Sequence, residues 1–165
     1  MGWNEELRSL ESKLLTARTF FAELRMVNGR TVVFPFAEWL EQEKHRAGRY
    51  NHYFSLLVLA SLKLGAPAIV RRVSSSLRTS DILGLVDGNG TRRLVHRLRG
   101  IRAAEQHHMV GIILPQTDRA GAQIAARRLR NVLAADDAVT IGLAVFPDDS
   151  TNPAELLNIA KVDRK

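Results

Sequence analysis

Apolar and polar positions recur with two different periods along the chain, and the period separates predicted strands from predicted helices. Almost continuously apolar segments, typical of strands buried on both faces, occupy residues 53–62, 81–86, 109–114 and 139–146. Apolar residues at steps of three and four predict helices at 36–49, 67–77, 119–133 and 152–161. From the first strand onward the order is βαββαβ. The predicted fold class is therefore α/β (α+β), with a ferredoxin-like central sheet flanked by helices.

The N-terminal segment has a different apolar pattern, with alternating steps of three and four at Leu7, Leu10, Leu14, Ala17, Phe21 and Leu24. This spacing is typical of the seam of a short coiled coil, and equally of a helix that lies on the domain. Asn28-Gly29 is predicted to end this helix, because glycine readily adopts the left-handed conformation there. We therefore predict an N-terminal helix or coiled-coil linker at 1–30 and a globular domain at 31–165.

Composition limits the class of protein. The chain has 165 residues, of which 45% are hydrophobic and 25% charged, the balance of a globular domain with one core. It has no cysteine, which excludes disulfides and thiolate metal sites and fits a reducing compartment such as the cytoplasm. No apolar run approaches 18 residues, so no membrane segment is expected.

Charge favours anionic partners. Lys and Arg number 24 against 17 Asp and Glu, a formal net charge of +7. The densest basic stretch, 92–102, has five arginines and no acid, and it falls in a predicted insertion at about 88–106. Either a solvated face or a phosphate-contacting patch explains it. No aromatic residue is interleaved for base stacking, which disfavours binding of single-stranded nucleic acid.

Several segments, in order and close to the expected spacing, resemble one known family. They are 46–50, 55–59, 78–81, 112–118, 122–130 and 139–147. Together they resemble the GGDEF domain of the diguanylate cyclases over roughly residues 36–161. The resemblance implies the nucleotide-cyclase-like form of the βαββαβ fold, a bacterial signalling role and partners such as a second copy or another signalling protein, contacted through the N-terminal helix.

The residues that such a cyclase needs for catalysis are missing, so the resemblance is to a degenerate GGDEF domain. Joining two nucleoside triphosphates requires carboxylates that hold divalent metal. In the family two of them follow the first strand, and the aligned positions are Ala60 and Leu62. The signature turn aligns with 87–91 or with 106–110, and neither has a glycine pair followed by two acids. We expect no catalytic residue, no metal site and no cyclase activity.

Adjacent His107 and His108 do not restore a metal site. Neighbouring residues on a strand point to opposite faces, so the two imidazoles cannot ligate one ion without distortion.

A regulatory site of the family is retained in sequence. Many members bind the product, cyclic di-GMP, through an Arg-x-x-Asp motif before the signature turn and an arginine on the following helix. The matching residues here are Arg78, Asp81 and Arg128. Arginine can contact phosphate and guanine, and a carboxylate can accept hydrogen bonds from the guanine edge. In an alternative without a ligand, Arg78 caps the preceding helix or pairs with Asp81. Lys63 is a further residue that could add positive charge to the ligand site.

Three functions are compatible with these residues. The first is an inactive domain that binds cyclic di-GMP through Arg78, Asp81 and Arg128, with no other cofactor. The second is a dimerisation or protein-interaction module that binds no ligand. The third is a basic nucleic-acid-binding domain, since the same fold hosts RNA-recognition modules. The strands lack an exposed aromatic pair for stacking, which makes nucleic acid the weakest of the three.

Overall fold

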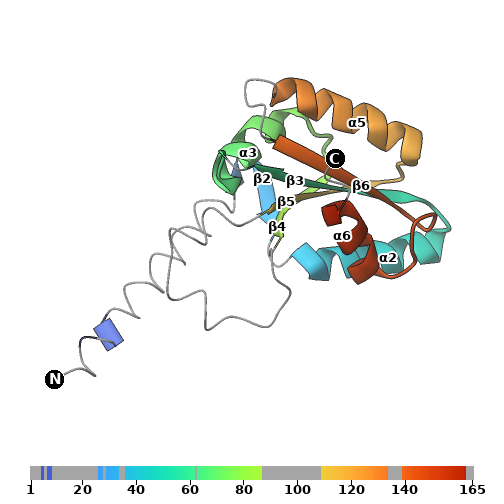
Figure 1. Ribbon diagram of the computed structural model, residues 1–165. Coiled ribbons are helices and arrows are strands. Elements are labelled where there is room, and N and C mark those ends of the chain that lie inside the picture. The colour runs from blue at the N-terminus through green and yellow to red at the C-terminus, as the bar shows by residue number, and fades with distance from the viewer. Residues whose placement is uncertain are drawn as a thin grey trace.

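The computed structural model describes residues 5, 7, 8, 26, 27, 29–33, 36–61, 63–86, 109–133 and 139–162. Its strands are β1 (Met26–Val27), β2 (Arg30–Val33), β3 (Phe54–Ser61), β4 (Ile82–Val86), β5 (Met109–Pro115) and β6 (Val139–Phe146). Its helices are α2 (Phe36–Tyr50), α3 (Ala66–Val73), the short 3-10 helix η1 (Ser74–Ser76), α5 (Arg119–Val132) and α6 (Pro153–Val162). The strands form one sheet in the order β1-β2-β4-β5-β3-β6 (Figure 1).

The sheet is covered on both faces by helices. Figure 1 shows α3 and α5 above the sheet and α2 and α6 below it. Each face has its own apolar cluster: one includes Ile69 and Leu129 from α3 and α5, and the other includes Phe36 and Leu156 from α2 and α6. Strand β3 is central to both, because six of its eight residues are buried. The long apolar run therefore lies in the middle of the molecule.

The predicted α+β fold with a βαββαβ core is confirmed. The core order β4-β5-β3-β6 is that of a ferredoxin-like sheet, and β3 pairs antiparallel with both of its neighbours. Helix and strand limits agree with the sequence pattern to within a few residues. The largest difference is at the end of α3, where the predicted helix passes into η1 at Ser74.

The N-terminal region differs from the sequence prediction. Asn28-Gly29 was expected to end a helix, yet Met26–Val27 and the first residues of β2 form an antiparallel pair of strands. Gly29 has φ +73, so it supplies the left-handed conformation for a hairpin rather than for a helix end. Strand β2 then pairs in parallel with β4. The β-branched run of Thr31, Val32 and Val33 favours this strand.

Other sequence expectations concern residues outside the described ranges. Glu5, Leu7 and Arg8 are helical, but most of the proposed coiled-coil seam lies outside the described residues. So do the insertion at 88–106, the histidine pair, and the turn positions 87–91 and 106–108. Within the described part of the chain, no helix has the length and apolar character needed to cross a bilayer.

Candidate ligand-binding site

The candidate site begins with the loop that connects η1 to β4, residues 77–81. Its ends are joined by two hydrogen bonds: the Asp81 N–H donates to the Arg78 carbonyl at 3.1 Å, and the Arg78 N–H donates to Asp81 Oδ2 at 2.7 Å. Asp81 is 6% exposed, whereas Arg78 is exposed. The Arg-x-x-Asp spacing therefore closes a tight loop in which the carboxylate points inward and the guanidinium is accessible to solvent.

Helix α5 brings the second arginine to the same place. Asp118 caps the helix by accepting from the Gly121 N–H at 2.8 Å, and its position is fixed because buried Ser55 donates to the Thr117 carbonyl at 2.7 Å. The buried face of α5 consists of Ala122, Ala125 and Leu129. Arg128 comes directly before Leu129 and is exposed.

The three predicted residues lie around one small hollow. Its volume is about 30 Å³, and it is lined by Arg78, Asp81, Leu114, Thr117, Gly121, Ile124, Ala125 and Arg128. Among the described residues, neither Arg78 nor Arg128 has a hydrogen-bond or ion-pair partner for its guanidinium group, and Asp81 Oδ1 accepts no hydrogen bond. Two guanidinium groups and one carboxylate oxygen therefore remain able to contact a ligand placed over the hollow.

Burial is the main influence on the Asp81 carboxyl group, and it raises the pKa above the usual value. The Arg78 N–H and the positive charges of Arg78, Arg30 and Arg128 act in the opposite direction and offset part of this increase. The three arginines thus favour the ionised carboxylate in an otherwise unfavourable position.

The raised pKa of Asp81 gives the folding free energy a defined pH dependence. Between the unfolded pKa, about 3.9, and the higher folded value, the native protein binds more protons than the unfolded chain, so this residue makes the protein less stable as the pH rises through that window. Asp81→Asn keeps an oxygen for the Arg78 N–H but does not titrate. We expect the free energy of unfolding of the wild type, measured with urea, to decrease as the pH rises through this window, and that of Asp81→Asn to lack this contribution. An equal pH dependence in both proteins would contradict this.

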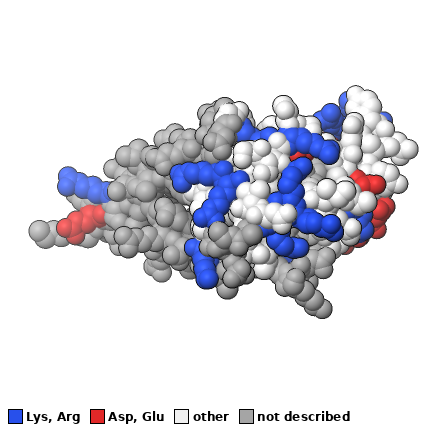
Figure 2. Space-filling view, turned by 90° about the horizontal axis from the view of Figure 1, so that it is seen from above, with Lys and Arg blue, Asp and Glu red and all other residues white. Residues whose placement is uncertain are grey.

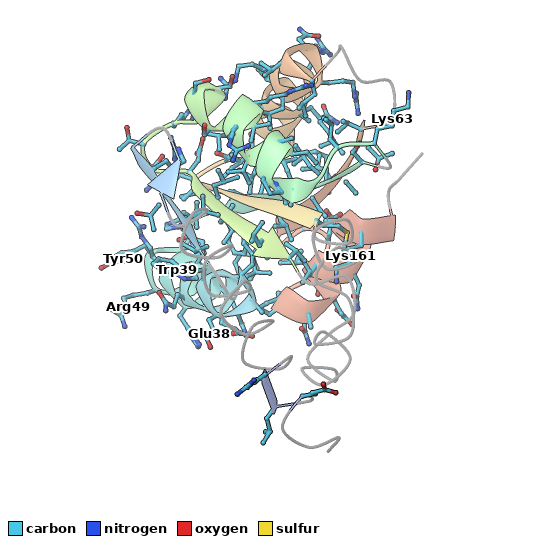
Figure 3. The ribbon with its side chains drawn as sticks, turned by 90° about the vertical axis from the view of Figure 1, so that its left-hand side faces the viewer. Glu38, Trp39, Arg49, Tyr50, Lys63 and Lys161 are labelled. Atoms are coloured by element: carbon cyan, nitrogen blue, oxygen red, sulfur yellow. The ribbon has the colours of Figure 1, made fainter. Side chains whose placement is uncertain are left out.

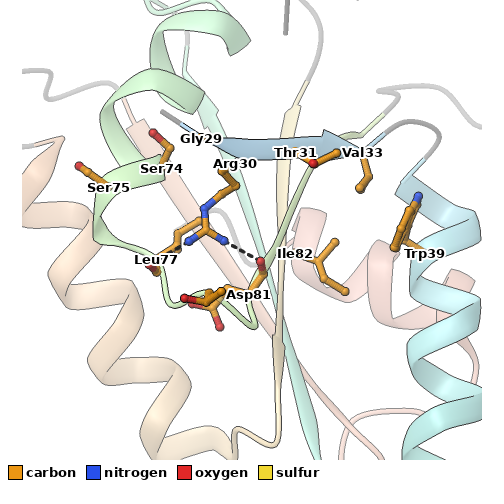
Figure 4. A pocket seen from close by; sticks show the side chains of 11 residues that line it. Gly29, Arg30, Thr31, Val33, Trp39, Ser74, Ser75, Leu77, Asp81 and Ile82 are labelled. Atoms are coloured by element: carbon orange, nitrogen blue, oxygen red, sulfur yellow. Dashed lines mark hydrogen bonds between the residues drawn. The ribbon is translucent and has the colours of Figure 1, made fainter. Parts of the chain in front are cut away.

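Arg30 also belongs to the site, and the sequence prediction did not include it. Its guanidinium donates to the backbone carbonyls of Asp81 at 2.8 Å, Leu77 at 3.0 Å and Arg78 at 2.7 Å. A wider cleft of about 600 Å³ lies on this side of the loop, with Arg30 and Asp81 at its base and Trp39 of α2 on its far side (Figure 4). The loop therefore separates the hollow beside α5 from the cleft beside β2.

The face around the hollow is basic. Figure 2, which looks onto α3 and α5, shows Lys and Arg side chains spread across this face and acidic side chains mainly at the two ends of the view. Exposed arginines on these elements and the adjoining loop are Arg71, Arg72, Arg78, Arg119, Arg127, Arg128 and Arg130. Lys63 is exposed but lines neither the hollow nor the cleft (Figure 3). The field at the site favours an anion.

The end of β3 does not fit a catalytic metal. Ala60, the first position expected to hold a carboxylate, is half-buried and packs against the apolar cluster below the sheet. Its methyl group has no donor atom for Mg²⁺, which requires oxygen ligands. Leu62, the second position, lies outside the described residues, and its side chain too is a hydrocarbon.

Comparison with known proteins gives a consistent result for the fold. No family model and no curated protein matches the sequence. Among solved structures, the GGDEF domain of YfiN (TpbB) from Pseudomonas aeruginosa is similar, with a TM-score of 0.55 and 19% identity over 76% of this chain and 82% of that one. A sensory box/GGDEF family protein from Caulobacter crescentus is also similar, with a TM-score of 0.58 and 14% identity over 82% of this chain and 91% of that one.

A third similar structure is the diguanylate cyclase SiaD from Pseudomonas aeruginosa, solved in complex with its activator SiaC. The TM-score is 0.57 and the identity 17%, over 96% of this chain and 68% of that one. At these identities the likeness concerns the backbone, and function has to be argued from the site. The chain has the fold of a GGDEF domain.

Proposed function

We propose that this domain binds cyclic di-GMP over the hollow between the 77–81 loop and α5, and that it does not synthesise the nucleotide. One observation supports the proposal above the others. Arg78, Asp81 and Arg128, selected from two segments far apart in the sequence, line the same hollow.

The available groups match the chemistry of the ligand. Cyclic di-GMP carries two phosphates and two guanines, so it needs cationic donors and an acceptor for the guanine N1 and N2 hydrogens. The guanidinium groups of Arg78 and Arg128 supply the donors, and Asp81 Oδ1 supplies the acceptor. A volume of about 30 Å³ is about that of one water molecule. The nucleotide would therefore lie across the opening, in contact with the exposed Arg78 and Arg128, and only the edge of one guanine would reach into the hollow toward the buried Asp81.

Calorimetric titration of cyclic di-GMP into the purified domain tests the binding. We expect saturable binding that weakens as salt is raised, since the ligand is a dianion on a basic face. GTP with Mg²⁺ is the control for general affinity toward guanine nucleotides. If GTP binds as tightly as cyclic di-GMP, or if neither ligand releases heat, the proposal is wrong.

The second half of the proposal predicts no turnover. Incubation of the domain with GTP and either Mg²⁺ or Mn²⁺ should give no cyclic di-GMP above the level without protein, because Ala60 and Leu62 cannot hold the metal that aligns the reacting groups. Chromatography of the nucleotides measures this, with an active cyclase run in parallel. Formation of cyclic di-GMP that depends on protein concentration would contradict the assignment.

A protein-interaction module is the alternative, and exposed aromatic residues on α2 favour it. Trp39 is 38% exposed at the edge of the cleft, and Tyr50 is 66% exposed at the other end of the helix (Figure 3). Such residues often supply contact area at interfaces. In this alternative cyclic di-GMP releases no heat, and Arg78→Ala leaves the association with the partner unchanged.

A further inference from the structure

The three hydrogen bonds of Arg30 converge on a single loop. Its planar guanidinium bonds to backbone carbonyls at both ends of the 77–81 segment, at 2.7, 2.8 and 3.0 Å. One rigid group with several donors therefore fixes the separation between the two ends of the loop. Figure 4 shows the bond to Asp81, with the side chain reaching from β2 across the base of the cleft.

Strand pairing places this arginine beside the loop. In the parallel register of β2 with β4, Val32 lies opposite Leu83 and Val33 opposite Gly84. Extended two residues back along the chain, this register leads to Arg30 and to Asp81, the residue before β4, and the Arg30 guanidinium bonds to the Asp81 carbonyl. Arg30 also pairs with Val27 of β1, so it belongs to the N-terminal hairpin and to the loop contact at once.

We propose that Arg30 is a positioning residue that holds the 77–81 loop in the conformation needed by the ligand and couples this loop to the N-terminal hairpin. The ligand half of this inference rests on the proposed function. The three hydrogen bonds of Arg30 go to backbone carbonyls, so they leave the side-chain groups assigned to the nucleotide free for it. Coupling through a shared loop is reciprocal: a ligand that orders the loop also orders the hairpin.

Arg30→Lys tests the positioning in the absence of any ligand. Lysine keeps the charge but cannot reproduce the planar arrangement of donors. We expect hydrogen–deuterium exchange at the Asp81 amide to become about tenfold faster or more, since at least one of three bonds is lost. Exchange at Leu57 in the core of the sheet should not change, which shows that the variant is folded. Arg49→Lys, an exposed arginine on α2, is the matched control.

The same variant then tests the coupling. We expect Arg30→Lys to bind cyclic di-GMP about tenfold more weakly than the wild type. Adding the nucleotide should slow exchange at the Arg30 and Thr31 amides in the wild type and much less in the variant. Unchanged exchange at Asp81 overturns the positioning role, whether or not the nucleotide binds. If Arg30→Lys binds cyclic di-GMP as tightly as the wild type does, the role of Arg30 in ligand binding is overturned. If the wild type does not bind the nucleotide, both that role and the proposed function are overturned.

Discussion

Replacing Arg78 and Arg128 together with alanine is expected to remove measurable cyclic di-GMP binding, and either single replacement is expected to weaken it by about 10- to 100-fold. Hydrogen bonds to charged groups contribute roughly 1.5–3 kcal/mol, and 1.4 kcal/mol corresponds to a factor of ten in affinity. Both side chains are exposed, and Asp81 keeps the bond from the residue 78 N–H and the charge of Arg30, so the variants should remain folded. Calorimetry measures the affinities, and urea unfolding shows that the variants remain folded.

Arg127→Ala is the control for this experiment. Arg127 precedes Arg128 on α5 and is also exposed, but it does not line the hollow. If its removal weakens binding as much as removal of Arg128, the nucleotide is attracted by the basic face in general. The specific site would then be excluded.

The largest expected effect on stability is that of Gly142→Ala. In the middle of β6, a Cβ at this position would overlap the carbonyl oxygen of Ala160 in α6 and lie 2.8 Å from its carbonyl carbon. The backbones of strand and helix would have to separate, which we expect to destabilise the fold by about 3 kcal/mol or more. Urea unfolding, or failure to obtain folded protein, reports the result.

Gly48→Ala is the control for Gly142→Ala, because it makes the same substitution at a position where the added methyl group meets no neighbour. Gly48 lies within α2, and an added Cβ meets nothing within 4 Å. We expect a gain of about 0.5–1 kcal/mol, because alanine favours the helix more than glycine does. A Gly142→Ala variant as stable as the wild type would instead show that α6 does not pack this closely against β6.

The elements of the core could be predicted because their signals are local. The apolar run that predicts β3 and the Asn152-Pro153 pair that predicts the start of α6 are each contained in a short stretch of sequence. Both elements are present in the structure. Arg128 was selected through the resemblance to the GGDEF domain, by counting from Pro115 at the end of β5, and the sequence could not show that it lies near Arg78.

Nonlocal contacts explain what the sequence could not predict. Strand β2 has four residues and β1 two, so neither gives a periodic pattern long enough to identify. Without β2 there was no reason to place Arg30 beside Asp81. The inward direction of the Asp81 carboxylate and its bond to the Arg78 N–H were equally hidden, since burial is set by the elements packed around the loop.

Binding of cyclic di-GMP between the 77–81 loop and α5 is tested best by titrating ¹⁵N-labelled protein with the nucleotide and following the amides by two-dimensional NMR. The titration reports binding and position at once. We expect shifts at the amides of 78–81 and along α5 from its start as far as Arg128, with the amides of α2 unchanged. No shift at millimolar nucleotide, or shifts confined to the cleft beside Trp39, would contradict it.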